Sequence, residues 1–166
     1  MRRLAALVTL LVLAACGDDA ILPGGGPRDV AFRAISERQN PGLCVEDPQF
    51  ALAMNVAEWK QSWQRSTGCQ PAPPEAPPLL VSEAGIVAWW KTEGCLGYSI
   101  KTTRVYTNGR VVTVSADEGE SPGEFCATAI GGLESFLAVN ALAVRGAETV
   151  RFLLDGTEIG SVPVPH

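Results

Sequence analysis

The chain has 166 residues, a formal net charge of −5 and 46% hydrophobic side chains, which fits one globular domain of ordinary size. The acidic balance argues against a nucleic-acid partner and against a polybasic membrane patch. The one histidine is His166, at the very end of the sequence, so we expect neither histidine-based catalysis nor a histidine metal site.

The first residues have the pattern of an export signal. Arg2 and Arg3 precede the apolar run Leu4–Leu13, which is too short to span a bilayer. The run leads into Leu-Ala-Ala-Cys, which ends at Cys16 and resembles the lipobox of bacterial lipoproteins. The resemblance implies a signal peptide over residues 1–15 and a Cys16 that carries acyl chains such as palmitate. The alternatives are an ordinary signal peptide with a chance cysteine, or a single N-terminal membrane anchor.

Residues 16–28 are expected to be the lipidated cysteine and a flexible tether. The stretch after Cys16 is rich in glycine and proline, and twelve such residues span about 20 Å as a random coil. Several acyl chains together give stable anchoring. Gly17 follows the cysteine, and the resemblance then favours the outer membrane where the organism has one. We therefore expect an exported protein, lipid-anchored in the bacterial cell envelope, with residues 29–166 as a single domain.

The expected domain holds four cysteines, which are Cys44, Cys69, Cys95 and Cys126. An even number in an exported domain predicts two disulfide bonds, with three connectivities open. We favour Cys44–Cys69 and Cys95–Cys126, because each pair would join neighbouring elements. No two of these cysteines form a Cys-x-x-Cys pair, so neither a redox motif nor a zinc site is indicated.

Alternating apolar and polar residues predict that the domain is mostly β-structure. The clearest feature is Gly97–Ala116, where two β-branched runs flank Asn108-Gly109, a strong hairpin signal that we place at the centre of an antiparallel sheet. Asp155-Gly156 predicts a second hairpin, and Gly131-Gly132 is expected to break a strand. Strands are also expected at Asp29–Ser36, Phe50–Met54, Leu79–Val81, Gly85–Thr92, Glu124–Ile130, Ser135–Ala141, Thr149–Leu154 and Ile159–Val164.

One amphipathic helix is expected between the early strands. Asn55 can cap it, Val56, Trp59 and Trp63 share one face, and Thr67-Gly68 ends it. The following Gln70–Pro78 is too rich in proline for a helix or a central strand and predicts an extended crossing. The expected fold is therefore α+β and mostly β: a small antiparallel sandwich or half-open barrel with one amphipathic helix, stapled by disulfides.

The sequence offers few candidates for chemistry. Asp117, Glu118 and Glu120 share a loop but lack the spacing of a known calcium motif, so a solvated loop is the simpler interpretation. No carboxylate pair stands out, and we expect no enzyme activity, no cofactor and no metal site. Trp89 and Trp90 are adjacent on a strand and must point to opposite faces, so one of them is the best candidate for partner binding. Cover by the proline-rich segment is the alternative.

With these residues in view, the body resembles the C-terminal domain family of PrcB, the lipoprotein that stabilises a bacterial surface protease. Scattered positions over Phe32–Val139 carry the resemblance, including the two-tryptophan helix Asn55–Trp63 and the Gly-Tyr strand Gly97–Ile100. Pro78-Leu79-Leu80 stands where the family often has Asp-Phe, and the final hairpin lies outside the match. The family has no catalytic residues, and the resemblance implies a protein that supports another exported protein by contact.

We therefore expect a membrane-anchored lipoprotein that acts by protein contact, as an accessory or stabilising subunit of an envelope protease or of another complex. The alternative is a small-molecule or carbohydrate-binding envelope lipoprotein that uses the same aromatic side chains around a pocket.

Overall fold

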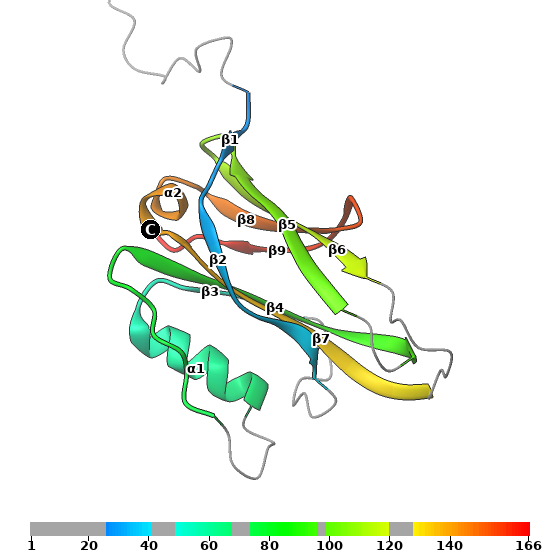
Figure 1. Ribbon diagram of the computed structural model, residues 1–166. Helices are drawn as coiled ribbons and strands as arrows, with labels where there is room; N and C mark the ends of the chain where they lie inside the picture. The colour runs from blue at the N-terminus through cyan, green and yellow to red at the C-terminus, as the bar shows by residue number, and fades with distance from the viewer. Residues whose placement is uncertain (1–25, 41–48, 68–73, 96–98, 120–127) are drawn as a thin grey trace, which may run out of the picture.

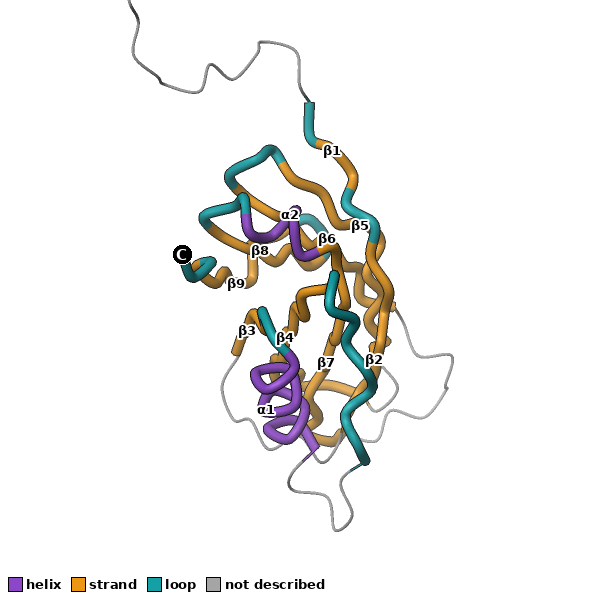
Figure 2. Tube along the Cα trace, turned by 90° about the vertical axis from the view of Figure 1, so that its left-hand side faces the viewer, coloured by secondary structure: helices purple, strands orange, loops and turns teal. Residues whose placement is uncertain are grey.

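Two β-sheets face each other, and a helix covers the outer face of one of them (Figures 1 and 2). The computed structural model describes residues 26–40, 49–67, 74–95, 99–119 and 128–166. Its elements are β1 (Arg28–Asp29), β2 (Phe32–Asn40), β3 (Gln49–Ala53), α1 (Val56–Thr67), β4 (Glu83–Cys95), β5 (Ser99–Thr107), β6 (Val111–Gly119), β7 (Thr128–Asn140), α2 (Ala141–Arg145), β8 (Thr149–Leu154) and β9 (Thr157–Pro163). The mostly-β prediction is confirmed, as two sheets that do not form a closed barrel.

The first sheet has the strand order β1-β5-β6-β8-β9, with the predicted hairpin β5–β6 at its middle. Gly109 turns that hairpin at a φ of 94°, and Asp155 and Gly156 turn the last one at 48° and 77°. The expected antiparallel pairing is confirmed for β1–β5, β5–β6 and β8–β9, whereas β6 pairs with β8 in parallel. The chain leaves this sheet after β6, forms β7 and α2, and returns, and such a long connection permits parallel pairing.

The second sheet has the order β2-β7-β4-β3, and β7 lies inside it. The expected break at Gly131-Gly132 is wrong, since β7 runs through both residues. Gly132 is paired with Asn40 on one side and with Lys91 on the other, so ladder hydrogen bonds on both edges hold the glycines extended.

Two expected strands near the second sheet also need correction. Asp29–Ser36 is not one strand: the Val30 amide donates to the Val105 carbonyl at 2.8 Å, and the chain then crosses to the second sheet as β2. Leu79–Val81 is not a strand, because Leu80 and Glu83 close a tight turn there through a 2.9 Å backbone hydrogen bond.

The two sheets are joined along both sides. On one side the Glu37 carboxylate of β2 accepts the Thr102 amide of β5 at 2.7 Å, which satisfies an edge N–H group beyond the β1 pairing. On the other side Phe50 of β3 packs on Phe152 of β8, with ring centroids 4.6 Å apart. Between them lies the larger core, whose buried members include Ile86, Leu137, Val112 and Val150.

The predicted helix is confirmed as α1, and its first turn explains where it begins. The Asn55 side chain accepts the Glu58 amide at 3.0 Å, while the Glu58 carboxylate accepts the Met54 amide at 2.7 Å. The short helix α2 was not predicted, and Asn140 caps it by accepting the Leu142 amide at 2.9 Å. None of the helices in the described part is long and apolar enough to cross a bilayer.

The predicted disulfides lie outside the described residues. Cys44, Cys69 and Cys126 fall in undescribed segments, and of Cys95 only the backbone, at the end of β4, is described. Cys16 and the expected signal peptide also lie outside the described residues.

Gly85 of β4 provides the space in which α1 packs. A Cβ atom at this position would overlap the ring of Trp59, which is only 1% exposed and has little room to move. We predict that Gly85→Ala lowers the free energy of unfolding by about 1–3 kcal/mol through overpacking. Gly26→Ala is the control, because nothing lies within 4 Å of its Cβ position. Chemical denaturation of both variants measures the difference, and equal stability would contradict this packing.

Candidate functional site

Three tryptophans surround Phe136 of β7 on the helix-covered face of the second sheet. The ring centroids of Trp59, Trp63 and Trp89 lie 5.4, 4.9 and 5.7 Å from that of Phe136, each edge-on. Edge-on aromatic pairs contribute about 0.5–1.5 kcal/mol each beyond their buried area. This cluster therefore fixes α1 against β4 and β7.

The proline-rich segment lies across the two helix tryptophans. The Trp59 indole Nε1–H donates to the Pro77 carbonyl at 2.8 Å, and the Trp63 Nε1–H donates to the Pro74 carbonyl at 2.9 Å. Prolines suit this position because the segment stays extended and its carbonyls remain free to accept. Both buried indole N–H groups are thereby satisfied, so the described part of the segment, Pro74–Pro78, is held on the domain.

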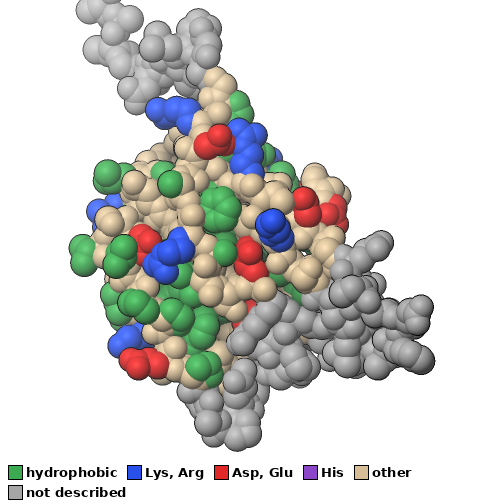
Figure 3. Space-filling model, viewed as in Figure 1, with side chains coloured by type: hydrophobic (Ala, Val, Ile, Leu, Met, Phe, Trp, Pro, Cys, Tyr) green, Lys and Arg blue, Asp and Glu red, His purple; other side chains and the backbone are tan. Residues whose placement is uncertain are grey.

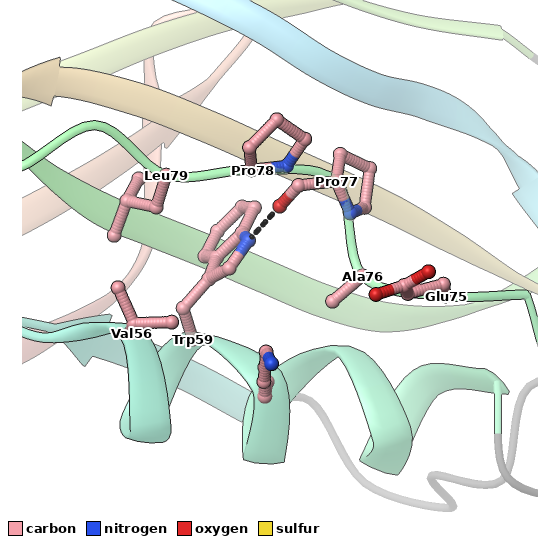
Figure 4. Close-up of a pocket in the computed structure, with 8 residues that line it drawn as sticks. Val56, Trp59, Glu75, Ala76, Pro77, Pro78 and Leu79 are labelled. Atoms are coloured by element: carbon pink, nitrogen blue, oxygen red, sulfur yellow. Dashed lines mark hydrogen bonds between the residues drawn. The ribbon is translucent and has the colours of Figure 1, made fainter.

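Between α1 and this segment lies an open groove of about 510 Å³ (Figure 4). Val56 stands on the helix side and Leu79 on the opposite wall, while the ring of Trp59 stands between α1 and the segment (Figure 4). Val56 is 47% exposed. The whole lining is Val56, Trp59, Lys60, Glu75, Ala76, Pro77, Pro78 and Leu79. Figure 3 shows hydrophobic side chains gathered over this part of the surface, at the lower left. We call it the α1 groove.

The chemistry of the α1 groove favours an apolar guest. The indole N–H of Trp59 and the carbonyl of Pro77 already bond each other, which removes them as partners for a polar ligand. Lys60 and Glu75 bring one charge of each sign to the lining. Such a groove can receive an apolar side chain or a short apolar segment, with charged groups at the rim to orient it.

An ion pair holds the far end of the proline-rich segment on the sheet. Glu83 accepts the Leu80 amide at 2.9 Å and the Arg33 Nη2 at 2.8 Å, and Arg33 also reaches the Pro78 carbonyl at 3.4 Å. Partial burial by itself would raise the pKa of Glu83, but the Leu80 amide and the Arg33 guanidinium outweigh it and hold the pKa below its ordinary value.

Glu134 of β7 is the one carboxylate among the described residues that is completely buried. It accepts hydrogen bonds from the Ser36 hydroxyl at 3.0 Å and from the buried Ser66 hydroxyl, and so it ties β2 and α1 to β7. A substrate could not reach this group without removing α1. Glu134 is therefore a structural residue and gives no support to catalysis.

The structure changes the expectation for the two strand tryptophans. Trp89 is 0% exposed and belongs to the core under α1, so it offers no surface to a partner. The physical reason is that β4 lies inside its sheet, with α1 over the face on which residue 89 points. The Trp90 side chain lies outside the described residues. The proline-rich segment covers the helix tryptophans Trp59 and Trp63.

The acidic loop does not form a metal site in the part of the chain that is described. Asp117 and Glu118 end β6, and Glu120 lies outside the described residues. Partial burial, with Asp155 nearby, raises the pKa of Glu118. No group of three His, Cys, Asp or Glu among the described residues is placed to hold a metal ion.

Sequence reasoning missed the α1 groove. A signal was available, since a helix with two tryptophans on one face is followed by a proline-rich segment that must pass back to the sheet.

Comparison with family models, with curated proteins and with solved structures finds no match to this chain. The site therefore has to be interpreted from its own geometry.

The Glu83 ion pair predicts an acid-sensitive part of the stability. Because the folded-state pKa of Glu83 is lowered, its contribution is present above its ordinary pKa of 4.5 and is lost as the pH falls through the folded value. We predict that Glu83→Gln lowers the free energy of unfolding by about 1 kcal/mol at neutral pH. On acidification, the free energy of unfolding of this variant should fall less than that of the wild type. Denaturation curves across this range measure it; parallel pH profiles would contradict the assignment.

Removal of the buried Glu134 carboxylate should be far more costly. Glu134→Ala leaves a cavity and takes an acceptor from the buried Ser66, so we expect a loss of about 2–4 kcal/mol. Glu134→Gln keeps an acceptor and should lose less. Glu75→Ala, at an exposed glutamate, is the control. If Glu134→Ala unfolds at the same denaturant concentration as Glu75→Ala, Glu134 does not hold α1 in place.

Proposed function

We propose that this protein is an exported lipoprotein, anchored in the bacterial cell envelope through acyl chains on Cys16, that acts by contact with another exported protein. The α1 groove is the proposed contact site. The observation that supports the proposal is the half-exposed Val56 beside an open groove in which Trp59 and Pro77 already bond each other. Val56, Leu79 and three proline-segment residues place apolar side chains together along this groove, and such grouped apolar surface marks a candidate protein-binding site.

The position of the groove fits this role. In both views β1, the first strand after the proposed tether, lies at the upper end, whereas α1 lies at the lower end (Figures 1 and 2). The two views differ by a turn about the vertical, so this separation is real in space. A domain tethered before Arg28 would therefore present the α1 groove away from the membrane, where another envelope protein can reach it.

The proposed partner is an envelope protease or another exported complex, for which the chain would be an accessory or stabilising subunit. The resemblance to the PrcB C-terminal domain family is the reason for naming a protease. The alternative is a small-molecule or carbohydrate ligand, for which the groove volume is adequate but its free polar groups are few.

A photo-crosslinking residue placed in the groove tests the proposal directly. With the crosslinker at Val56 in the full chain, expressed in its own cells, we expect one exported protein to be captured. With the crosslinker at Gln61, an exposed α1 position outside the groove, we expect much less of the same product. Mass spectrometry identifies the product. Equal capture at both positions, or none at Val56, would contradict a partner in the groove.

A charge in the groove should then weaken the complex without harming the fold. Val56→Asp puts a carboxylate in the first turn of α1, where the helix dipole tolerates it, but replaces an apolar contact with a hydrated charge that a partner has to dehydrate. We expect a loss of association of at least about tenfold, because this dehydration costs more than the weak pairing of the new carboxylate with Lys60, four residues further on, returns. Gln61→Asp is the matched control. The alternative, a small-molecule or carbohydrate ligand, is tested by titrating the protein with sugars and small amphiphiles while tryptophan fluorescence is recorded. A saturable change in fluorescence that Val56→Asp abolishes would support this alternative.

A further inference from the structure

A second apolar surface lies where the N-terminal segment enters the domain. A hollow of about 380 Å³ is lined by β1 and α2 together, with Arg28 and Ala31 on one wall and Leu142 and Ala143 on the other. Arg28, near the start of the described chain, therefore shares this hollow with Leu142. The two elements that line the hollow, β1 and α2, lie in the upper half of both views, above α1 (Figures 1 and 2).

The short helix α2 points one apolar side chain out of the protein. Ala141 and Val144 are buried in the core between the sheets, whereas Leu142 is 76% exposed. Arg145 is also exposed, and residues three apart on a helix share a face, so Leu142 and Arg145 point outward together. The exposed side of α2 therefore pairs one apolar side chain with one cation.

The neighbouring turn adds a second exposed apolar residue. The Ala141 amide donates to the Ser82 carbonyl at 2.9 Å, which fixes the turn before β4 against the start of α2. Val81, next to Ser82, is 99% exposed. Val81 and Leu142 are each next in sequence to one partner of this hydrogen bond, so they lie near each other. Both side chains are exposed to solvent, without cover from any described segment.

The charges around this surface are unequal. Arg104 pairs with Asp29 at 2.6 Å, and Arg110 pairs with Glu148 at 2.8 Å, so these four groups cancel. The exposed Arg28 and Arg145 are not in any ion pair among the described side chains. The surface is thus locally cationic on a chain whose net charge is −5.

We propose that the surface formed by Arg28, Val81, Leu142 and Arg145, which we call the α2 face, rests on an anionic phospholipid bilayer. The inference rests on the proposed lipid anchor at Cys16, because a tether of about 20 Å brings this face within reach of the headgroups. Two aliphatic side chains and two cations give only weak binding alone. Beside a covalent anchor they fix the orientation of the domain on the bilayer.

The test is photolabelling of the full chain, purified with its native N-terminus and reconstituted into vesicles. The vesicles contain phosphatidylcholine, phosphatidylglycerol and a phospholipid with a photoreactive headgroup. We expect labelled peptides from residues 80–82 and 141–145 and none from α1. Intact mass of the same sample reports acylation of Cys16 separately, so failure of the anchor and failure of the α2 face can be told apart.

Variants test which side chains of the α2 face bind the bilayer. Leu142→Ser and Arg145→Gln should each lower labelling of the α2 face by about fivefold, since each loses about 1 kcal/mol of membrane contact. The effect of Arg145→Gln should vanish in vesicles of phosphatidylcholine alone. Arg65→Gln, which removes an exposed arginine of α1 outside both the α1 groove and the α2 face, should change nothing. Even labelling over the whole domain would overturn the proposal. The proposal would also be overturned if Leu142→Ser abolished self-association of the protein in vesicles but left lipid labelling of the α2 face unchanged. The α2 face would then bind a second copy of the chain and not the bilayer.

Discussion

The packing of α1 on the second sheet depends on the aromatic contacts of Phe136. Its ring meets Trp59 and Trp63 from α1 and Trp89 from β4, each edge-on, and β7 carries it in the middle of the second sheet. The indole N–H groups of the helix tryptophans then hold the proline-rich segment in place. The α1 groove exists because this segment stands off the helix at Val56 while its carbonyls bind the tryptophans.

The two ends of the molecule differ in what they offer. At the α1 end the surface is an open apolar groove with Lys60 and Glu75 in its lining, which suits a protein segment. Towards the β1 end, Leu142 lies exposed with Arg28 and Arg145, two arginines outside any described ion pair, which suits a charged lipid surface. An anchored adaptor needs one contact that orients it and another that remains available. The two surfaces adjoin at Leu79 and Val81, since Leu79 lines the groove and the exposed Val81 lies two residues further on.

Local chemistry explains which parts of the fold were predictable. The hairpins at Asn108-Gly109 and Asp155-Gly156 follow from positive φ angles that few residues accept, and α1 follows from its Asn55 cap and apolar spacing. The parallel pairing of β6 with β8 is a contact between distant segments, and no local pattern encodes it. The same limit applies to the site. Alternation along β4 separates the faces of its neighbouring tryptophans, but only the position of α1 decides that Trp89 is covered.

Hydrogen exchange on the full chain in its native membranes would test most directly whether a partner protein occupies the α1 groove. The comparison is with the same chain reconstituted into vesicles of pure lipid, so that any membrane contact is common to both samples. The account predicts slower exchange in native membranes at the start of α1 and around Leu79, with no change on the five-stranded sheet. Identical exchange at these amides in the two samples, from cells that express the chain at its normal level, would contradict it.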